Sequence, residues 1–177
     1  MLLYFTISFL FSAAVFAELC FGLSGFLVPL TATAGFYFTV THRWDRAVIP
    51  FAVACTVLDL SYGRQIPFDI LVVPPVLLVG TYWRNRGNTK SLVAQTIPGC
   101  LIGLMAFMMS SLYSACYGMN TGRGLDFLPV RYALQGFAFG GCAMPLMVVI
   151  LDGAMGAFGF RKFTALNNFR DRERADD

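Results

Sequence analysis

The chain has 177 residues, of which 57% are hydrophobic and only 13% are charged, and its formal net charge is +3. Soluble domains carry about 25% charged residues, and a soluble core of this size could not bury so much apolar surface, so the composition excludes a water-soluble globular protein. The basic residues form no stripe interleaved with aromatic residues, which argues against nucleic-acid binding.

The thirteen Lys and Arg residues are concentrated in three short parts of the chain. The clusters lie at 42–46, 84–90 and 161–174, and Arg64, Arg123 and Arg131 fall outside them. Because the cytoplasmic loops of membrane proteins carry the Lys and Arg excess, we expect all three clusters on the cytoplasmic side. The chain must then cross the membrane an even number of times between clusters.

The apolar region before the first cluster and the two between the clusters are each too long for one transmembrane helix of about 20 residues, and each is interrupted once. The breaks fall at Glu18 to Pro29, at Ser61 to Pro67 and at the polar loop 118–131. The expected helices cover 2–19, 26–41, 47–60, 68–83, 92–117 and 132–160. The sequence therefore predicts an all-α integral membrane protein, a compact bundle of six transmembrane helices over 1–166 with both termini cytoplasmic, followed by a charged tail over 167–177.

A polar turn separates the third and fourth expected helices. Asp59 and Asp69 bracket a turn that contains Gly63, Arg64 and Pro67, so the two carboxylates and the guanidinium can meet near the non-cytoplasmic surface. Ionisable residues in membrane segments are costly and mark functional or structural sites. The simplest interpretation is a local network that holds two helix ends. A proton or cation site, or a polar patch for a partner protein, are the alternatives.

Two further acids and three prolines lie inside apolar segments. We expect Glu18 and Asp152 to lie at an interface or to pair with the hydroxyl of a neighbour. Pro74 and Pro75 fall inside the fourth expected helix, where the missing backbone donors bend or break it. A kink that shapes the bundle is one interpretation, and a discontinuity that binds substrate is the other. Pro145 marks a further kink in the last helix.

Small residues recur along the last two expected helices. Gly99 and Gly103 form a small-xxx-small stripe on the fifth, and Gly136 and Gly140 lie on the sixth. Such stripes permit close helix approach. We expect packing within the chain, with a partner's helix as the alternative.

The sequence has no motif for catalysis or metal binding. It contains no pair of nucleophile and base, no HExxH and no Gly-rich phosphate loop, and its single histidine, His42, lies in a basic loop. The five cysteines have neither CxxC nor Cys/His spacing. We expect no enzymatic activity, no metal and no cofactor. The N-terminus lacks the basic region of a signal peptide, so we expect its first helix to be retained.

The polar turn also carries a family resemblance. The residues Leu-Asp-Leu-Ser-Tyr-Gly-Arg-Gln-Ile-Pro-Phe at 58–68 resemble a segment of the bacterial rod shape-determining protein MreD family, in which an apolar helix ends in Leu-Asp and passes through a Gly- and Pro-containing turn into the next helix. The basic loops, the overall size and Ala143-Met144-Pro145 are similar too. Asp69, Pro74-Pro75 and Asp152 depart from the pattern, which indicates a divergent member.

The resemblance implies a non-enzymatic scaffold in the bacterial inner membrane. Such a protein would bind MreC and help couple the cytoskeletal filament MreB to peptidoglycan synthesis by RodA and a class B penicillin-binding transpeptidase. The family's architecture is similar to the substrate-binding subunits of energy-coupling-factor transporters. The alternative function is therefore a substrate-binding or ion-coupled transporter subunit, which the intramembrane acids also favour.

Overall fold

The computed structural model describes residues 2–64, 67–86, 91, 93–120 and 130–166. These residues form helices and turns without any strand, which confirms the all-α class. The expected tail at 167–177 and the centre of the expected polar loop, 121–129, lie outside them. The elements are α1 (Leu2–Leu23), α2 (Leu30–His42), α3 (Trp44–Ser61), the 3-10 helix η1 (Asp69–Val72), α4 (Val73–Arg86), the 3-10 helix η2 (Val93–Gln95), α5 (Thr96–Asn120) and α6 (Val130–Ala157).

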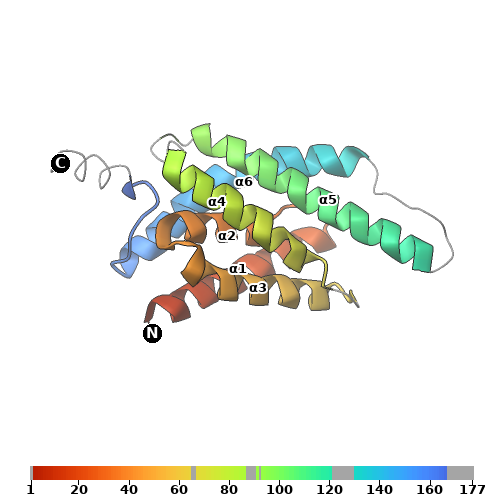
Figure 1. Cartoon of the computed structure of the whole chain (residues 1–177), viewed down its shortest axis with the longest axis horizontal. Coiled ribbons are helices and arrows are strands. Elements are labelled where there is room, and N and C mark those ends of the chain that lie inside the picture. Colours follow the sequence, from red (N-terminus) through yellow and green to blue (C-terminus); the bar gives the residue numbers. More distant parts are fainter. Residues whose placement is uncertain (1, 65–66, 87–90, 92, 121–129, 167–177) are drawn as a thin grey trace.

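Helix α2 forms the centre of the bundle. Figure 1 shows α1 and α3 on one side, α5 and α6 on the other, and α2 and α4 between them. All 13 residues of α2 are buried, and the helix contacts α1, α3, α4 and α6. Two of its buried threonines are satisfied within the helix, because the hydroxyls of Thr39 and Thr41 donate to the carbonyl oxygens of Gly35 and Tyr37 at 2.7 and 2.9 Å.

Helices α5 and α6 are the most closely packed pair, and glycines allow their approach. A methyl group on Gly99 or Gly103 would collide with the carbonyl oxygen of Gly140 or Gly136, respectively. From the other side, a Cβ on Gly136 would stand 2.7 Å from the carbonyl oxygen of Gly103. The four glycines of the two stripes therefore pack against one another within the chain.

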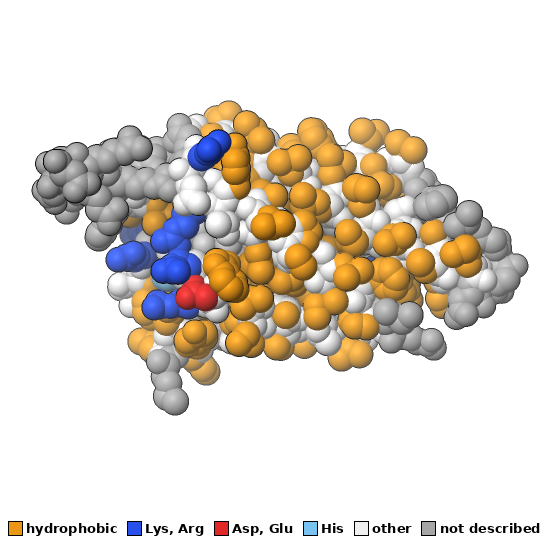
Figure 2. All heavy atoms as spheres, viewed as in Figure 1, with side chains coloured by type: hydrophobic (Ala, Val, Ile, Leu, Met, Phe, Trp, Pro, Cys, Tyr) orange, Lys and Arg blue, Asp and Glu red, His pale blue; other side chains and the backbone are white. Residues whose placement is uncertain are grey.

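The outer surface is apolar over most of the molecule. Figure 2 shows hydrophobic side chains over the length of one face, with Lys and Arg gathered at one end. In the described part of the chain, three helices are long and apolar enough to cross a membrane, namely Leu2–Leu23, Val93–Met119 and Val130–Ala157. These features indicate a membrane protein. The start of α1 and the residues after α6 lie at the same end of the bundle, and the turn after α3 lies at the other (Figure 1).

Three helices begin later than expected. One of them is α5, which starts at Thr96 after the 3-10 helix η2 rather than at residue 92. Residues 26–29 are not helical, and α2 starts at Leu30, because Gly25 adopts a left-handed φ of 79° and Pro29 disfavours a helical residue before it. Similarly, Asp69–Val72 form a 3-10 turn and α4 starts at Val73.

The expected kink at Pro74 and Pro75 is therefore wrong in position. Both residues lie in the first turn of α4, where backbone N–H groups have no intrahelical acceptor and proline costs little. Pro145 does lie inside a helix, α6, and Pro50 lies inside α3.

Candidate functional site

The chain reverses direction after α3 through a glycine-dependent helix ending. Gly63 has a φ of 68°, a left-handed conformation that glycine adopts without steric cost. The N–H of Gly63 donates to the carbonyl of Leu60, and that of Arg64 donates to the carbonyl of Asp59, each at 3.0 Å. This pair of bonds is a Schellman ending. It returns the backbone of Arg64 to the level of Asp59.

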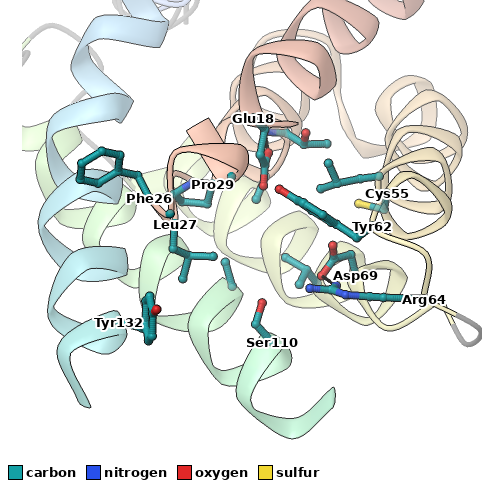
Figure 3. A pocket seen from close by; sticks show the side chains of 17 residues that line it. Glu18, Phe26, Leu27, Pro29, Cys55, Tyr62, Arg64, Asp69, Ser110 and Tyr132 are labelled. Carbon is teal, nitrogen blue, oxygen red and sulfur yellow. Dashed lines mark hydrogen bonds and ion pairs between the residues drawn. The ribbon is translucent and has the colours of Figure 1, made fainter. Parts of the chain in front are cut away.

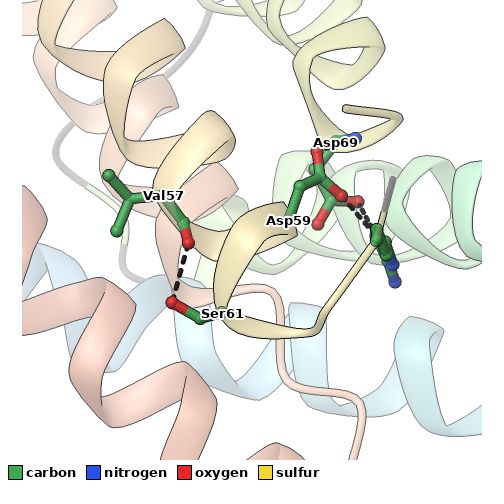
Figure 4. Close-up of polar contacts among 5 residues, drawn as sticks. Val57, Asp59, Ser61 and Asp69 are labelled. Atoms are coloured by element: carbon green, nitrogen blue, oxygen red, sulfur yellow. Dashed lines mark hydrogen bonds and ion pairs between the residues drawn. The ribbon is translucent and has the colours of Figure 1, made fainter. Parts of the chain in front are cut away.

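The side chains of Asp59, Arg64 and Asp69 meet at this turn, and we call them the polar clamp (Figure 4). The Nη1 of Arg64 lies 2.8 Å from Oδ1 of Asp59 and 2.9 Å from Oδ1 of Asp69. The second oxygen of Asp59 accepts the backbone N–H of Asp69 at 2.8 Å. The side chain of Asp59 is only 1% exposed. The clamp therefore joins the end of α3 to the start of η1.

Aromatic rings cover the guanidinium of the clamp. The Cζ of Arg64 lies 5.3 Å from the ring centre of Tyr62 and 4.9 Å from that of Tyr113 on α5, which are cation–π distances. Burial alone would lower the pKa of Arg64, but the charge of Asp69 and the hydrogen bonds to both carboxylates outweigh it and raise the pKa above its ordinary value. Arg64 thus remains a fixed positive charge.

A cavity of about 290 Å³ lies beside the clamp (Figure 3). Its polar lining comes from several elements, and the residues include Glu18, Thr31, Tyr62, Arg64, Asp69, Ser110 and Tyr132. In Figure 3 the ring of Tyr62 lies between Glu18 and the pair Arg64 and Asp69. The Oε2 of Glu18 accepts the backbone N–H of Thr31 at 2.7 Å. The carboxylate of α1 therefore satisfies a backbone donor in the first turn of α2.

Asp152 anchors the segment that follows α6. Its Oδ1 accepts the hydroxyl of Tyr37 and the N–H of Phe163, both at 2.6 Å. Its Oδ2 accepts the hydroxyl of Thr164 at 2.8 Å and the N–H of the same residue at 3.1 Å. The ring of Phe163 stacks on Tyr37 with centroids 5.7 Å apart. Asp152 thus ties α6, α2 and the segment after α6 together.

The remaining predicted site residues make none of these polar contacts. Pro67 is exposed, next to residues outside the described part of the chain. Gly99, Gly103, Gly136 and Gly140 belong to the α5–α6 contact. Among the described residues, no group of three His, Cys, Asp or Glu could hold a metal ion.

A second cavity, which the sequence did not indicate, lies between α1 and α3 and measures about 510 Å³. We call it the α1–α3 groove. Its lining is largely apolar and includes Ile49, Val53 and Val57 of α3. Ser8 and Ser12 of α1 contribute small side chains, and the hydroxyl of Ser12 donates to the carbonyl of Ser8 at 3.0 Å. The groove is an apolar surface on the side of the bundle.

A comparison with protein-family models finds no match, and comparisons with curated proteins and with solved structures find no significant one.

Proposed function

We propose that this chain is a divergent MreD-like protein, a non-enzymatic scaffold of the bacterial inner membrane. It would bind MreC and, through it, help couple MreB to peptidoglycan synthesis by RodA and a class B penicillin-binding transpeptidase. The sequence of the polar turn at 58–68 supports the family, and the three long apolar helices support the membrane location.

The observation that carries this proposal is how the acids of the apolar segments are used. Glu18 bonds the start of α2, and Asp59 and Asp69 hold Arg64 between α3 and η1. Asp152 bonds α2 and the segment after α6. Each carboxylate joins two parts of the chain. Carboxylates that bond two parts of the chain make a bundle more rigid. This favours a scaffold function over the conduction of protons or ions.

We further propose that all six helices lie in the membrane, with both termini in the cytoplasm. At 1.5 Å per residue, α2 is about 20 Å long, which is shorter than the hydrocarbon layer of about 30 Å. Its burial removes the need to match that thickness, because neighbouring helices rather than lipid surround it. The concentration of Lys and Arg at one end supports the orientation.

The α1–α3 groove is the surface that best suits a helix of MreC. Helix α1 packs on one side only, and Phe5, Phe9 and Phe16 are 73%, 63% and 70% exposed. Ser8 and Ser12 line the groove, and their small side chains allow another helix to come close. An apolar groove with a small-residue floor fits a membrane helix better than it fits a polar ligand.

The groove can be tested with one matched pair of substitutions. Val53 on the groove and Val149 on α6 are 58% and 54% exposed. We expect Val53→Trp to fill the groove and to reduce co-purification of MreC in mild detergent at least tenfold. Val149→Trp should leave co-purification unchanged.

Size-exclusion profiles and thermal unfolding would show that both variants fold. If the folded wild-type protein retains no MreC, the scaffold function is wrong. If Val53→Trp retains MreC as well as wild type does, the groove is not the contact.

The cavity beside the clamp favours a second candidate, a subunit that binds a small molecule for transport. Its volume of about 290 Å³ lies at the lower end of small-molecule sites. Glu18, Tyr62 and Ser110 would offer polar contacts at its wall. A small molecule retained by the purified protein in native mass spectrometry would favour this function over the scaffold.

A further inference from the structure

The basic end of the molecule contains a recess that neither proposed function uses. It lies between the junction of α2 with α3 and the last turns of α4, and its volume is about 270 Å³. The lining residues are Thr39, Arg43, Trp44, Thr81, Arg84 and Asn85. Two arginines from different elements therefore line one small recess.

The charge around the recess is strongly positive. Two Lys or Arg residues come from each of the described segments 42–46, 84–86 and 161–162, whereas Asp45 is the one acid in those segments. The Nε of Arg43 lies 3.8 Å from Asp45, which is too long for a hydrogen bond. Figure 2 shows this concentration of Lys and Arg at one end. Such a field attracts anions to the recess.

The donors around the recess suit a phosphate group. The planar guanidinium groups of Arg43 and Arg84 match the oxygens of a phosphate in a two-pronged contact. Helix α3 begins at Trp44, and no side chain caps its N-terminus. Backbone N–H groups at the start of an 18-residue helix thus lie next to Arg43. The amide of Asn85 adds a neutral donor to the same lining.

The surroundings of the recess indicate a lipid rather than a soluble anion. Trp44 and Tyr82 are 53% and 59% exposed, as amphipathic rings are at the boundary between headgroups and acyl chains. The Cζ of Arg86 lies 5.8 Å from the ring centre of Tyr82. One turn deeper on α4, Leu78 is 72% exposed. A charged level, an aromatic level and an apolar level thus follow one another along α4.

We propose that this recess binds the phosphate group of an anionic phospholipid. The phosphate lies between Arg43 and Arg84, and the acyl chains lie along the exposed face of α4 beside Leu78. Basic pockets between helices on the cytoplasmic side of membranes are suited to such headgroups. This site rests on the basic recess alone and does not depend on the binding of MreC.

Native mass spectrometry of the purified protein, titrated with phosphatidylglycerol or phosphatidylcholine, tests the site. We expect phosphatidylglycerol to bind more tightly, and Arg43→Gln to weaken it about fivefold, the effect of one arginine near an anionic surface. Arg43→Gln/Arg84→Gln should weaken it about thirtyfold. Arg131→Gln, at the opposite end of the bundle, should have no effect.

A glycine variant separates binding from folding. Arg43 has φ 72° and ψ 155°, a region that glycine occupies without strain. Arg43→Gly should therefore unfold no earlier than wild type and still bind phosphatidylglycerol about fivefold more weakly. Equal binding of the two lipids, or unchanged binding by Arg43→Gln, would overturn the proposal. Binding of inorganic phosphate in a parallel titration, without binding of phosphatidylglycerol, would overturn the assignment to a lipid.

Discussion

Arg64 is the residue on which the turn between α3 and η1 depends most. Its guanidinium neutralises Asp59, whose side chain is 1% exposed, and also pairs with Asp69. Removing one partner of a buried ion pair leaves a charge without compensation. The same guanidinium supports the rings of Tyr62 and Tyr113. The loss of this one side chain therefore affects both α3 and α5.

We predict that Arg64→Ala lowers the free energy of unfolding by about 3 kcal/mol. Arg64→Lys should recover part of the loss, because an ammonium keeps the charge but not the planar guanidinium that contacts the rings of Tyr62 and Tyr113. Unfolding in detergent, followed by circular dichroism, measures the difference. Arg131→Ala is the control, since Arg131 is exposed. If Arg64→Ala unfolds with the wild-type midpoint, the clamp does not stabilise the bundle.

At this scale, the sequence predicted contacts that are close along the chain and missed those that are distant. Asp59, Arg64 and Asp69 lie within one turn, so their spacing alone placed them near one another. Tyr113 on α5 and the bond from Tyr37 to Asp152 depend on which helices are neighbours. A pattern of apolar residues does not contain that information. The hydroxyl partner expected for Asp152 could therefore not be named.

Among the elements, α5 and α6 form the contact with the least free space. We predict that Gly136→Ala lowers the free energy of unfolding by about 1 to 3 kcal/mol, because the new methyl group would stand 2.7 Å from the carbonyl oxygen of Gly103. Gly153→Ala is a control on the same helix, since no atom lies within 4 Å of its added Cβ. It should be neutral or stabilising by up to about 1 kcal/mol. Equal midpoints for the two variants would contradict this close contact.

The bounds of the helices show where sequence patterns mislead. The apolar runs located each long helix, but they do not distinguish helix from an apolar segment that is not helical. Residues 26–29 are apolar, and Gly25 and Pro29 prevent them from joining α2. Pro74 and Pro75 start α4 rather than bending it. In both cases the exact position of a proline relative to the first helical turn decides the outcome.

For the molecule as a whole, the proposed orientation predicts which surfaces face the cytoplasm. In a background without cysteine, Ser61→Cys at the end of α3 and Asp45→Cys at its start are both exposed positions. A membrane-impermeant thiol reagent should label Ser61→Cys from outside intact spheroplasts, and Asp45→Cys only in inside-out vesicles. The opposite pattern would invert the topology, and labelling of both from one side would contradict a crossing by α3.

The bundle as a whole was less predictable than its helices. Composition indicated a membrane protein and the all-α class, because both follow from the number of apolar residues and from the lengths of the apolar segments. The α1–α3 groove and the recess at the basic end arise only once the helices are packed. Surfaces of this kind depend on gaps between distant segments, and no local pattern encodes them.

The complete burial of α2 has a consequence for how the protein is made. This helix has 13 residues, including four threonines, and presents no surface to lipid in the finished bundle. The ribosome synthesises α2 after α1 but before α3, α4 and α6, which make most of the contacts that bury it. A short, threonine-containing helix gains little from entering lipid alone. We therefore expect α2 to remain bound to the insertion machinery and to enter the membrane together with the helices that follow it.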